Sequence, residues 1–223
     1  MILSDFVAAT YLKAVGKRSS LTSTDEKYLK IVAMANAQVD AWQREADWSS
    51  QYDGDYPLAG TVTATNTFAI PEAVRKLSDQ RGDYVRIYWA DGETVSEFAI
   101  VPVNRLQNYD LTANVCAQNG SNLIFQRTFA TTDGEFGGTI KVPVYLYADE
   151  LDAETGSQEI PVDIPRWLVT ITAAEYIRND VTKQNQYPNL IAEANTLMER
   201  MKDDNDAQIE EPYFGFTLRG RTW

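Results

Sequence analysis

The spacing of apolar residues changes twice along this chain, and the order of the changes limits the folds open to it. Over residues 28–46 apolar side chains recur every three or four positions, which keeps them on one face of a helix. Over residues 61–147 short alternating runs are separated by glycine-containing turns, a pattern typical of antiparallel strands. The helical period returns over residues 163–201. The sequence therefore predicts an α+β protein, a helical bundle with an inserted antiparallel β-sandwich or barrel.

The N-terminal part predicts two helices. Ser4 is the candidate N-cap of a short first helix, and Gly16 is its candidate C-terminal stop. The tetrapeptide Ser23-Thr24-Asp25-Glu26 has the spacing of a capping box, which predicts a long helix over about residues 24–50.

The middle of the chain predicts strands and hairpins. Residues 61–70 and 84–89 alternate, and a further strand is expected over residues 139–147. Asp91-Gly92 and Asn119-Gly120 are turn dipeptides that predict hairpins. Residues 72–78, which follow a proline, are expected to form one or two helical turns.

The last third predicts two antiparallel helices separated by Tyr187-Pro188, and then an extended arm. The first helix carries an apolar stripe from Ile164 to Val181, and the second carries one from Leu190 to Met201. The predicted parts are a helical part (1–60), the β domain (61–150), a linker with the helical hairpin (151–204) and an extended C-terminal arm (205–223).

Composition removes several classes of chemistry. The chain has no histidine, which excludes Ser-His-Asp triads, Cys-His pairs and histidine-based zinc sites. Its one cysteine, Cys116, is expected in the core and fits synthesis in a reducing cytoplasm. The formal charge of −12 argues against tight DNA binding. No apolar run approaches the roughly 18 to 20 residues of a membrane span, and no signal peptide is expected.

Paired carboxylates are the remaining candidates for catalysis, and one acidic stretch is a candidate calcium loop. Most of these residues lie beside glycines in predicted turns, where solvation and turn geometry already favour Asp and Glu. We therefore expect no enzymatic activity, no metal and no cofactor, and a solvated linker over residues 149–159. The residues concerned are Asp53, Asp55, Asp91, Glu93, Asp133, Glu135, Asp149, Glu150, Asp152 and Glu154.

Aromatic side chains offer further candidates. Trp42, Trp89 and Trp167 are expected in the core. Trp48, at a predicted helix end, is expected either in the core or as an interface anchor. Tyr84 and Tyr88 could stack on a sugar or a base, although aromatic residues are common in strands in any case.

The end of the chain favours an interaction function. Its aromatic residues have no helical period and follow an acidic stretch and Pro212. This aromatic segment (residues 213–223) either docks on the chain's own body or reaches a partner by aromatic anchoring or strand addition. Two arginines within it suit an acidic partner surface. The candidate docking residues are Tyr213, Phe214, Phe216, Leu218, Arg219, Arg221 and Trp223.

Three stretches carry a resemblance to a known family. They are the helix end Trp42-Gln43-Arg44-Glu45-Ala46-Asp47-Trp48, the strand-then-proline stretch Phe68-Ala69-Ile70-Pro71-Glu72-Ala73-Val74-Arg75, and residues 160–178 with their alanine-rich helix face. On these stretches the chain resembles the podovirus-type head-to-tail adaptor (connector) proteins of tailed bacteriophages.

The resemblance implies a structural role in the neck of a virion. Such adaptors form a ring, usually dodecameric, beneath the portal and extend the DNA channel toward the tail. The resemblance gives the aromatic segment a portal partner and the β domain tail, nozzle or fibre partners. It also implies that genome DNA passes the acidic ring without specific binding, and that the protein is made in the host cytoplasm.

Two other functions remain open from the sequence. The chain could be another neck or tail component, such as a tail terminator or tube protein. It could also carry a carbohydrate-binding or hydrolytic β domain that acts at the host envelope.

Overall fold

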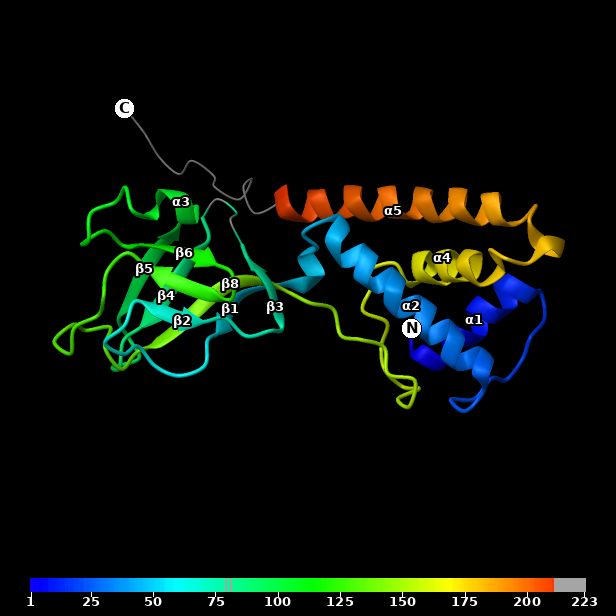
Figure 1. Ribbon diagram of the computed structural model, residues 1–223, viewed down its shortest axis with the longest axis horizontal. Coiled ribbons are helices and arrows are strands. Elements are labelled where there is room, and N and C mark those ends of the chain that lie inside the picture. The colour runs from blue at the N-terminus through cyan, green and yellow to red at the C-terminus, as the bar shows by residue number, and fades with distance from the viewer. Residues whose placement is uncertain (79, 81, 211–223) are drawn as a thin grey trace, which may run out of the picture. The chain divides into compact units, whose positions relative to one another are not determined.

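The computed structural model describes residues 1–78, 80 and 82–210, which form two compact units (Figure 1). A helical unit contains residues 1–50 and the chain from residue 148 onward, and a sheet unit contains Gln51–Tyr147. The sheet unit is therefore inserted in the helical unit, as the two changes of periodicity predict. It begins at residue 51 rather than at 61, because residues 52–57 form a strand that the sequence pattern does not predict.

Among the described residues, four α-helices and one isolated 3-10 helix form the helical unit, and another 3-10 helix leads into the sheet unit. Helix α4 contacts α1, α2 and α5, and it is buried on most of its circumference, so it is the central helix of the bundle (Figure 1). The elements are α1 (Leu3–Val15), α2 (Glu26–Glu45), η1 (Ser49–Gln51), α4 (Pro165–Ile177), η2 (Val181–Lys183) and α5 (Tyr187–Glu210).

The predicted end of α1 is confirmed, and its predicted start is wrong. Gly16 has φ 77° and its N–H donates to the Leu12 carbonyl oxygen at 2.8 Å, a left-handed stop that glycine adopts without a Cβ clash. Ser4 lies inside the helix, whose N-cap is Ile2 without a side-chain hydrogen bond. The backbone N–H of Ser4 instead donates to the Gly156 carbonyl oxygen at 3.0 Å, so a distant segment replaces the cap.

Helix α2 buries the predicted stripe but lacks the predicted capping box. It begins at Glu26, and its N-cap Asp25 makes no capping hydrogen bond. The Asp25 carboxylate accepts hydrogen bonds from the N–H and Oγ1 of Thr22, at 2.6 and 3.0 Å, because a local turn competes for it. The buried positions of the stripe are Tyr28, Val32, Ala35, Val39 and Trp42.

Helix α5 is longer than the sequence pattern predicts. Pro188 falls in its first turn, where a missing N–H costs little, and the helix continues to Glu210. Residues 205–210, expected at the start of the extended arm, are therefore helical. Val181, expected on the stripe of the preceding helix, lies in η2 and is 77% exposed.

In the described part of the sheet unit, eight strands form one curled sheet that resembles half of a barrel. The order is β1-β8-β4-β5-β6-β7-β2, with β3 also paired to β8; every pair is antiparallel except β5 with β6. A short helix α3 (Val103–Leu106) connects β5 and β6. The strands are β1 (Tyr52–Pro57), β2 (Thr67–Ala69), β3 (Val74–Leu77), β4 (Tyr84–Tyr88), β5 (Val95–Ile100), β6 (Val115–Asn119), β7 (Asn122–Phe125) and β8 (Thr139–Leu146).

Both predicted hairpins are confirmed, and the predicted helical turn is wrong. Asn119 pairs with Asn122 across a two-residue loop in which Gly120 has φ 60°. Gly92, with φ 74°, lies in the connection from β4 to β5. Residues 74–77 form β3 instead of a helical turn, because β8 offers them a free edge to pair with. Of the alternating residues 61–70, only Thr67–Ala69 form a strand.

Each unit has its own apolar core. The helical core includes Trp42, Trp48 and Trp167. The sheet core holds four phenylalanines whose rings meet edge to face, with centroids 4.8 Å apart for Phe98 and Phe125 and 5.2 Å for Phe125 and Phe129. Cys116 is buried in the same core, and burial raises the pKa of its thiol to about 12, as expected for a structural cysteine.

Candidate interaction site

The seven sequence-predicted docking residues of the aromatic segment lie outside the residues that the structure describes. They are Tyr213, Phe214, Phe216, Leu218, Arg219, Arg221 and Trp223. The structure describes the body that such a segment could contact. Candidate receptor surfaces on this body are its hollows and its exposed apolar side chains.

Trp48 is a core residue, as one of the two predictions for it had it. The alternative prediction, an interface anchor, is wrong. Its side chain is fully buried, stacks on Trp42 with centroids 5.0 Å apart, and donates through Nε1 to the Trp42 carbonyl oxygen at 2.8 Å. No surface of this side chain is left for a neighbouring molecule. Its placement fixes the chain where it leaves α2 for the sheet unit.

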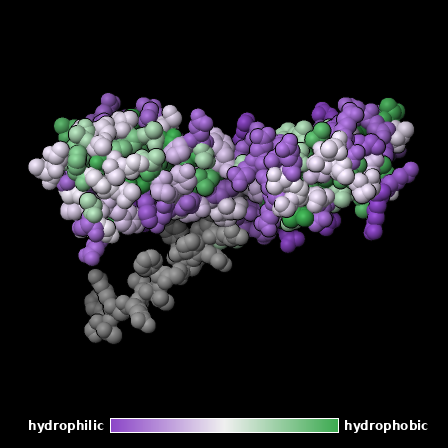
Figure 2. Space-filling view, turned by 90° about the horizontal axis from the view of Figure 1, so that it is seen from below, coloured by the Kyte–Doolittle hydropathy of each residue, from purple (hydrophilic) through white to green (hydrophobic). Residues whose placement is uncertain are grey.

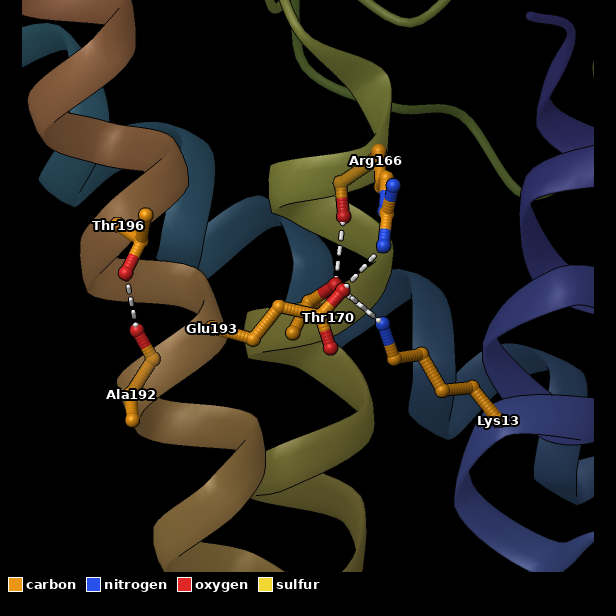
Figure 3. A network of polar contacts seen from close by, with 6 residues as sticks. All are labelled: Lys13, Arg166, Thr170, Ala192, Glu193 and Thr196. Atoms are coloured by element: carbon orange, nitrogen blue, oxygen red, sulfur yellow. Dashed lines mark hydrogen bonds and ion pairs between the residues drawn. The ribbon is translucent and has the colours of Figure 1, made fainter.

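A polar network joins three helices of the bundle (Figure 3). The Lys13 ammonium of α1 donates to Glu193 Oε1 of α5 at 2.9 Å and to Thr170 Oγ1 of α4 at 2.8 Å. Arg166 donates to the same Glu193 oxygen at 2.9 Å. The hydrogen bond from Lys13, followed by that from Arg166, holds the pKa of the Glu193 carboxyl below its usual value against the effect of burial. The network fixes the relative positions of α1, α4 and α5.

The sequence-predicted carboxylates of three turns are engaged in hydrogen bonds within the turn or in ion pairs. Asp91 accepts from the backbone N–H groups of Glu93 and Thr94, and the bond from Thr94 is the main reason that its pKa is lowered. Asp133 and Glu135 both pair with Arg127, at 3.4 and 2.6 Å. Asp152 accepts from the N–H of Glu154 at 2.9 Å. Over residues 1–78, 80 and 82–210, no group of three or more Cys, Asp or Glu is arranged to hold a metal ion.

Asp53 and Asp55 lie in a small hollow of about 240 Å³ in the sheet unit. There Arg86 pairs with Asp55 at 3.1 Å, and Tyr52 donates through its hydroxyl to Asp83 Oδ1 at 2.8 Å. Burial, with the Asp83 carboxylate second, raises the pKa of Tyr52. These internal contacts already engage most of the polar groups of the hollow.

Of the two sheet tyrosines considered for stacking on a sugar or a base, Tyr84 lines this hollow and Tyr88 does not. Tyr88 is half-buried, and the Lys141 ammonium covers its ring at 4.6 Å from the centroid. Tyr84 is 38% exposed. An occupied ring face leaves Tyr88 little surface for stacking on a sugar.

An acidic groove of about 590 Å³ crosses the helical unit between α2 and the segment that follows the sheet unit. Asn36 fixes its wall: its Oδ1 accepts from the Leu151 N–H at 2.8 Å, and its Nδ2 donates to the Leu151 carbonyl oxygen at 3.0 Å. Leu29 is 46% exposed at the rim. The groove is lined by Leu29, Val32, Ala33, Asn36, Glu150, Leu151, Asp152 and Ala153. The sequence predicts a solvated linker over residues 149–159, because the contact between Leu151 and α2 spans over a hundred positions and leaves no local pattern.

Two other surfaces expose apolar side chains. A hollow of about 410 Å³ along α1 is lined by Ala8, Ala9 and Leu12, with Arg18 at its edge. In the sheet unit, Val103, Tyr109 and Leu111 are 45%, 40% and 73% exposed around α3. On the face drawn in Figure 2, apolar residues form small separate groups among hydrophilic ones. Docking on this face must therefore use local sites.

No protein-family model matches the chain, and no curated protein matches it. Among the residues that the structure describes, every helix is too short or too polar to traverse a lipid bilayer. The candidate site therefore rests on geometry and charge alone, and the acidic groove combines an apolar floor with carboxylates better than the other surfaces do.

Proposed function

We propose that this chain is a non-enzymatic structural subunit of a tailed bacteriophage, an adaptor that forms a ring beneath the portal and extends the DNA channel toward the tail. The observation that carries the proposal is the topology, in which helices from both ends of the chain build one bundle and the sheet unit is inserted between them in the sequence. This is the arrangement implied by the resemblance of the three sequence stretches to podovirus-type adaptors.

The bundle supports this role because both ends of the sheet insertion are anchored in it. Trp48 is buried in the helical core on the outgoing connection. On the returning one, the N–H of Ala148 donates to Gln43 Oε1 at 3.0 Å. A subunit fixed in this way can hold its place in a ring while its inserted unit meets other proteins.

The charge of the chain supports a channel role. With 20 basic against 32 acidic residues, copies arranged in a ring would surround the channel with net negative charge. Phosphates are repelled by such a wall, and screening limits the effect to about 8 Å at physiological salt. Genome DNA would then pass the ring without specific binding.

The sheet unit offers a candidate contact for tail, nozzle or fibre proteins. The exposed side chains Val103, Tyr109 and Leu111 lie close together in sequence around α3. Exposed aromatic and aliphatic side chains of this kind are typical anchors of protein interfaces.

Imaging of the native particle tests the proposal directly. We expect density for this chain as a ring that touches the portal on one side and a tail component on the other. A position along the tail tube or at the tail end, without portal contact, would instead identify another neck or tail component.

Removal of residues 212–223 tests the role of the aromatic segment. We expect the shortened chain to keep the circular dichroism spectrum and thermal melting of the full chain but to lose assembly on portal-bearing heads. Assembly at the full-length level would sink the assignment of this segment as a docking element.

A further inference from the structure

The acidic groove has the properties of a receptor for an aromatic and basic peptide. Val32 and Leu151 form its buried floor, and Leu29 and Ala33 expose apolar surface along α2. Glu150 and Asp152 stand exposed on the opposite wall. The two hydrogen bonds between the Asn36 side chain and the Leu151 backbone hold that wall against α2, so the groove is formed before any ligand arrives.

We propose that the aromatic segment (residues 213–223) of a second copy of this chain binds in the acidic groove. The segment contains five aromatic or leucine side chains and two arginines, and it contains no acidic residue. Its apolar side chains would cover the exposed surface of Leu29 and Ala33. Its arginines would pair with the carboxylates of Glu150 and Asp152.

The carboxylates of the groove are available for such pairing. In the described part of the chain, no ion pair includes Glu150 or Asp152. Among the described residues, the carboxylate of Glu150 accepts only a long hydrogen bond of 3.5 Å, from Asn36 Nδ2. Asp152 accepts hydrogen bonds within its own turn, which leave its charge uncompensated.

The other hollows suit this ligand less well. The hollow along α1 carries Arg18 at its edge, which would repel the arginines of the segment. In the hollow of the sheet unit, Arg86 already pairs with Asp55, and Tyr52 already donates to Asp83. Charge complementarity therefore selects the acidic groove.

The direction of α5 indicates that the groove is filled by another copy. Lys202 pairs with Glu45 at 3.0 Å, and Asn205 donates to the Asp47 carbonyl oxygen at 3.1 Å. The C-terminal end of α5 therefore extends beyond the C-terminal end of α2, in the direction away from the groove. Figure 1 shows α5 running past the end of α2.

Distances along the helices make the same point. Asn36 lies about 14 Å along α2 from Glu45, and Glu210 lies about 12 Å along α5 beyond Lys202, at the rise of an α-helix. Fully extended chain from Glu210 brings Phe216 back by at most about 21 Å, which is short of Asn36 and far short of Leu29. The backbones of Tyr213, Phe214 and Phe216 therefore fall short of the groove of their own chain, and only the last residues of the segment have the length to return to it.

A segment of one copy in the groove of the next is a head-to-tail contact, which closes into a ring or continues as a filament. This goes beyond the proposed function, since it specifies how copies join and holds for any self-assembling subunit. It also gives the aromatic segment a partner other than the portal.

Disulfide cross-linking between two full-length chains tests the contact. One chain carries Leu29→Cys and the other, with a different affinity tag, carries Phe216→Cys; the native Cys116 is buried and stays out of the reaction. We expect a disulfide between the two kinds of chain. The matched control replaces Leu29→Cys with Val181→Cys, an exposed position outside the groove, and should give little product.

A synthetic peptide of residues 212–223 gives the second readout. Titrated into dilute full-length chain, it should bind with an affinity that falls as salt rises. Leu29→Glu or Glu150→Lys should weaken binding about tenfold, whereas Asp203→Lys, an equal change of charge on α5, should not.

Three results would overturn the contact. The first is that a chain carrying both Leu29→Cys and Phe216→Cys forms the disulfide only within itself, and never between two chains. The second is that the peptide binds the Glu150→Lys chain as tightly as the unchanged chain. The third is that the peptide binds isolated portal but not this chain. The last result would leave the proposed adaptor function standing. An image of the particle without a ring beneath the portal would remove that function and leave the contact between copies intact.

Discussion

At the scale of single residues, two glycines in the sheet unit are set by packing. A Cβ at Gly138 would lie 2.3 Å from the Tyr88 carbonyl oxygen, and one at Gly134 would lie 2.1 Å from the Trp89 ring. The Gly138 carbonyl oxygen also accepts from the Val62 N–H at 2.9 Å. Backbone segments approach so closely here that only glycine fits, and the sequence shows these residues merely as part of a turn.

Gly138→Ala is therefore expected to destabilise the sheet unit by about 1–3 kcal/mol, because the added methyl group would clash with backbone atoms, which cannot move away as a flexible side chain can. Urea unfolding followed by circular dichroism measures the change. Gly156→Ala is the matched control, since its Cβ would meet nothing closer than 3.8 Å. Equal effects of the two substitutions would contradict the packing explanation.

At the scale of elements, the far end of α5 is fixed to the chain that leaves α2. Asn205 is buried, accepts from the Ser49 N–H at 2.7 Å and donates to the Asp47 carbonyl oxygen at 3.1 Å. Its side chain satisfies backbone groups in a segment without regular helix. These two bonds explain why an acidic stretch with few apolar residues stays helical through position 205.

Asn205→Ala should lower the free energy of unfolding by about 1–3 kcal/mol, because the Ser49 N–H and the Asp47 carbonyl oxygen each lose their hydrogen bond to this side chain. Asn195→Ala, at an exposed position of the same helix, should change it little. Hydrogen exchange of residues 203–210 offers a local measurement. Unchanged protection there would show that α5 does not depend on this contact.

The network of Lys13, Glu193 and Arg166 predicts a dependence on pH. Since the pKa of Glu193 is lowered in the folded chain, its contribution is fully present above the ordinary carboxyl pKa of 4.5 and is lost as the pH falls through the lower value. Glu193→Gln should cost about 1 kcal/mol at pH 7, where the partly exposed pair is screened, and nothing in strong acid. The exposed Glu199→Gln should cost little at either pH, and a constant loss for Glu193→Gln would contradict the assignment.

At the scale of the whole molecule, the chain consists of two units with separate cores. The sheet core and the helical core share no residue. Tyr52, at the start of β1, pairs with Tyr145, next to the end of β8. The points where the chain enters and leaves the sheet unit therefore lie side by side. An insertion of this kind needs no change in the fold that receives it.

Residues 51–147 alone should therefore fold. We expect a β-type circular dichroism spectrum, and cooperative unfolding that the Phe125→Ala substitution abolishes or strongly weakens, because Phe125 is fully buried among the other phenylalanines. A Leu111→Ala chain, changed at an exposed residue, is the control. A fragment without cooperative unfolding would show that the sheet unit needs the helices.

Local patterning in the sequence predicts those parts of the fold that depend on residues close together along the chain. The stripe from Tyr28 to Trp42 is buried, the hairpins at Gly92 and Gly120 form, and the insertion of strands between helices is present. Periodicity and turn chemistry depend on residues a few positions apart, so they can be recognised in a single sequence. The resemblance and the ring remain predictions.

Features made by residues far apart in the sequence follow from the folded structure and not from local patterns. The strand β3 replaced an expected helical turn because β8 supplies its partners, and α5 extends to Glu210 with Asn205 bonded beyond α2. Trp48 entered the core, and Asn36 with Leu151 created the acidic groove. Each depends on a hydrogen bond or contact between distant segments, and such a contact has no local signature in the sequence.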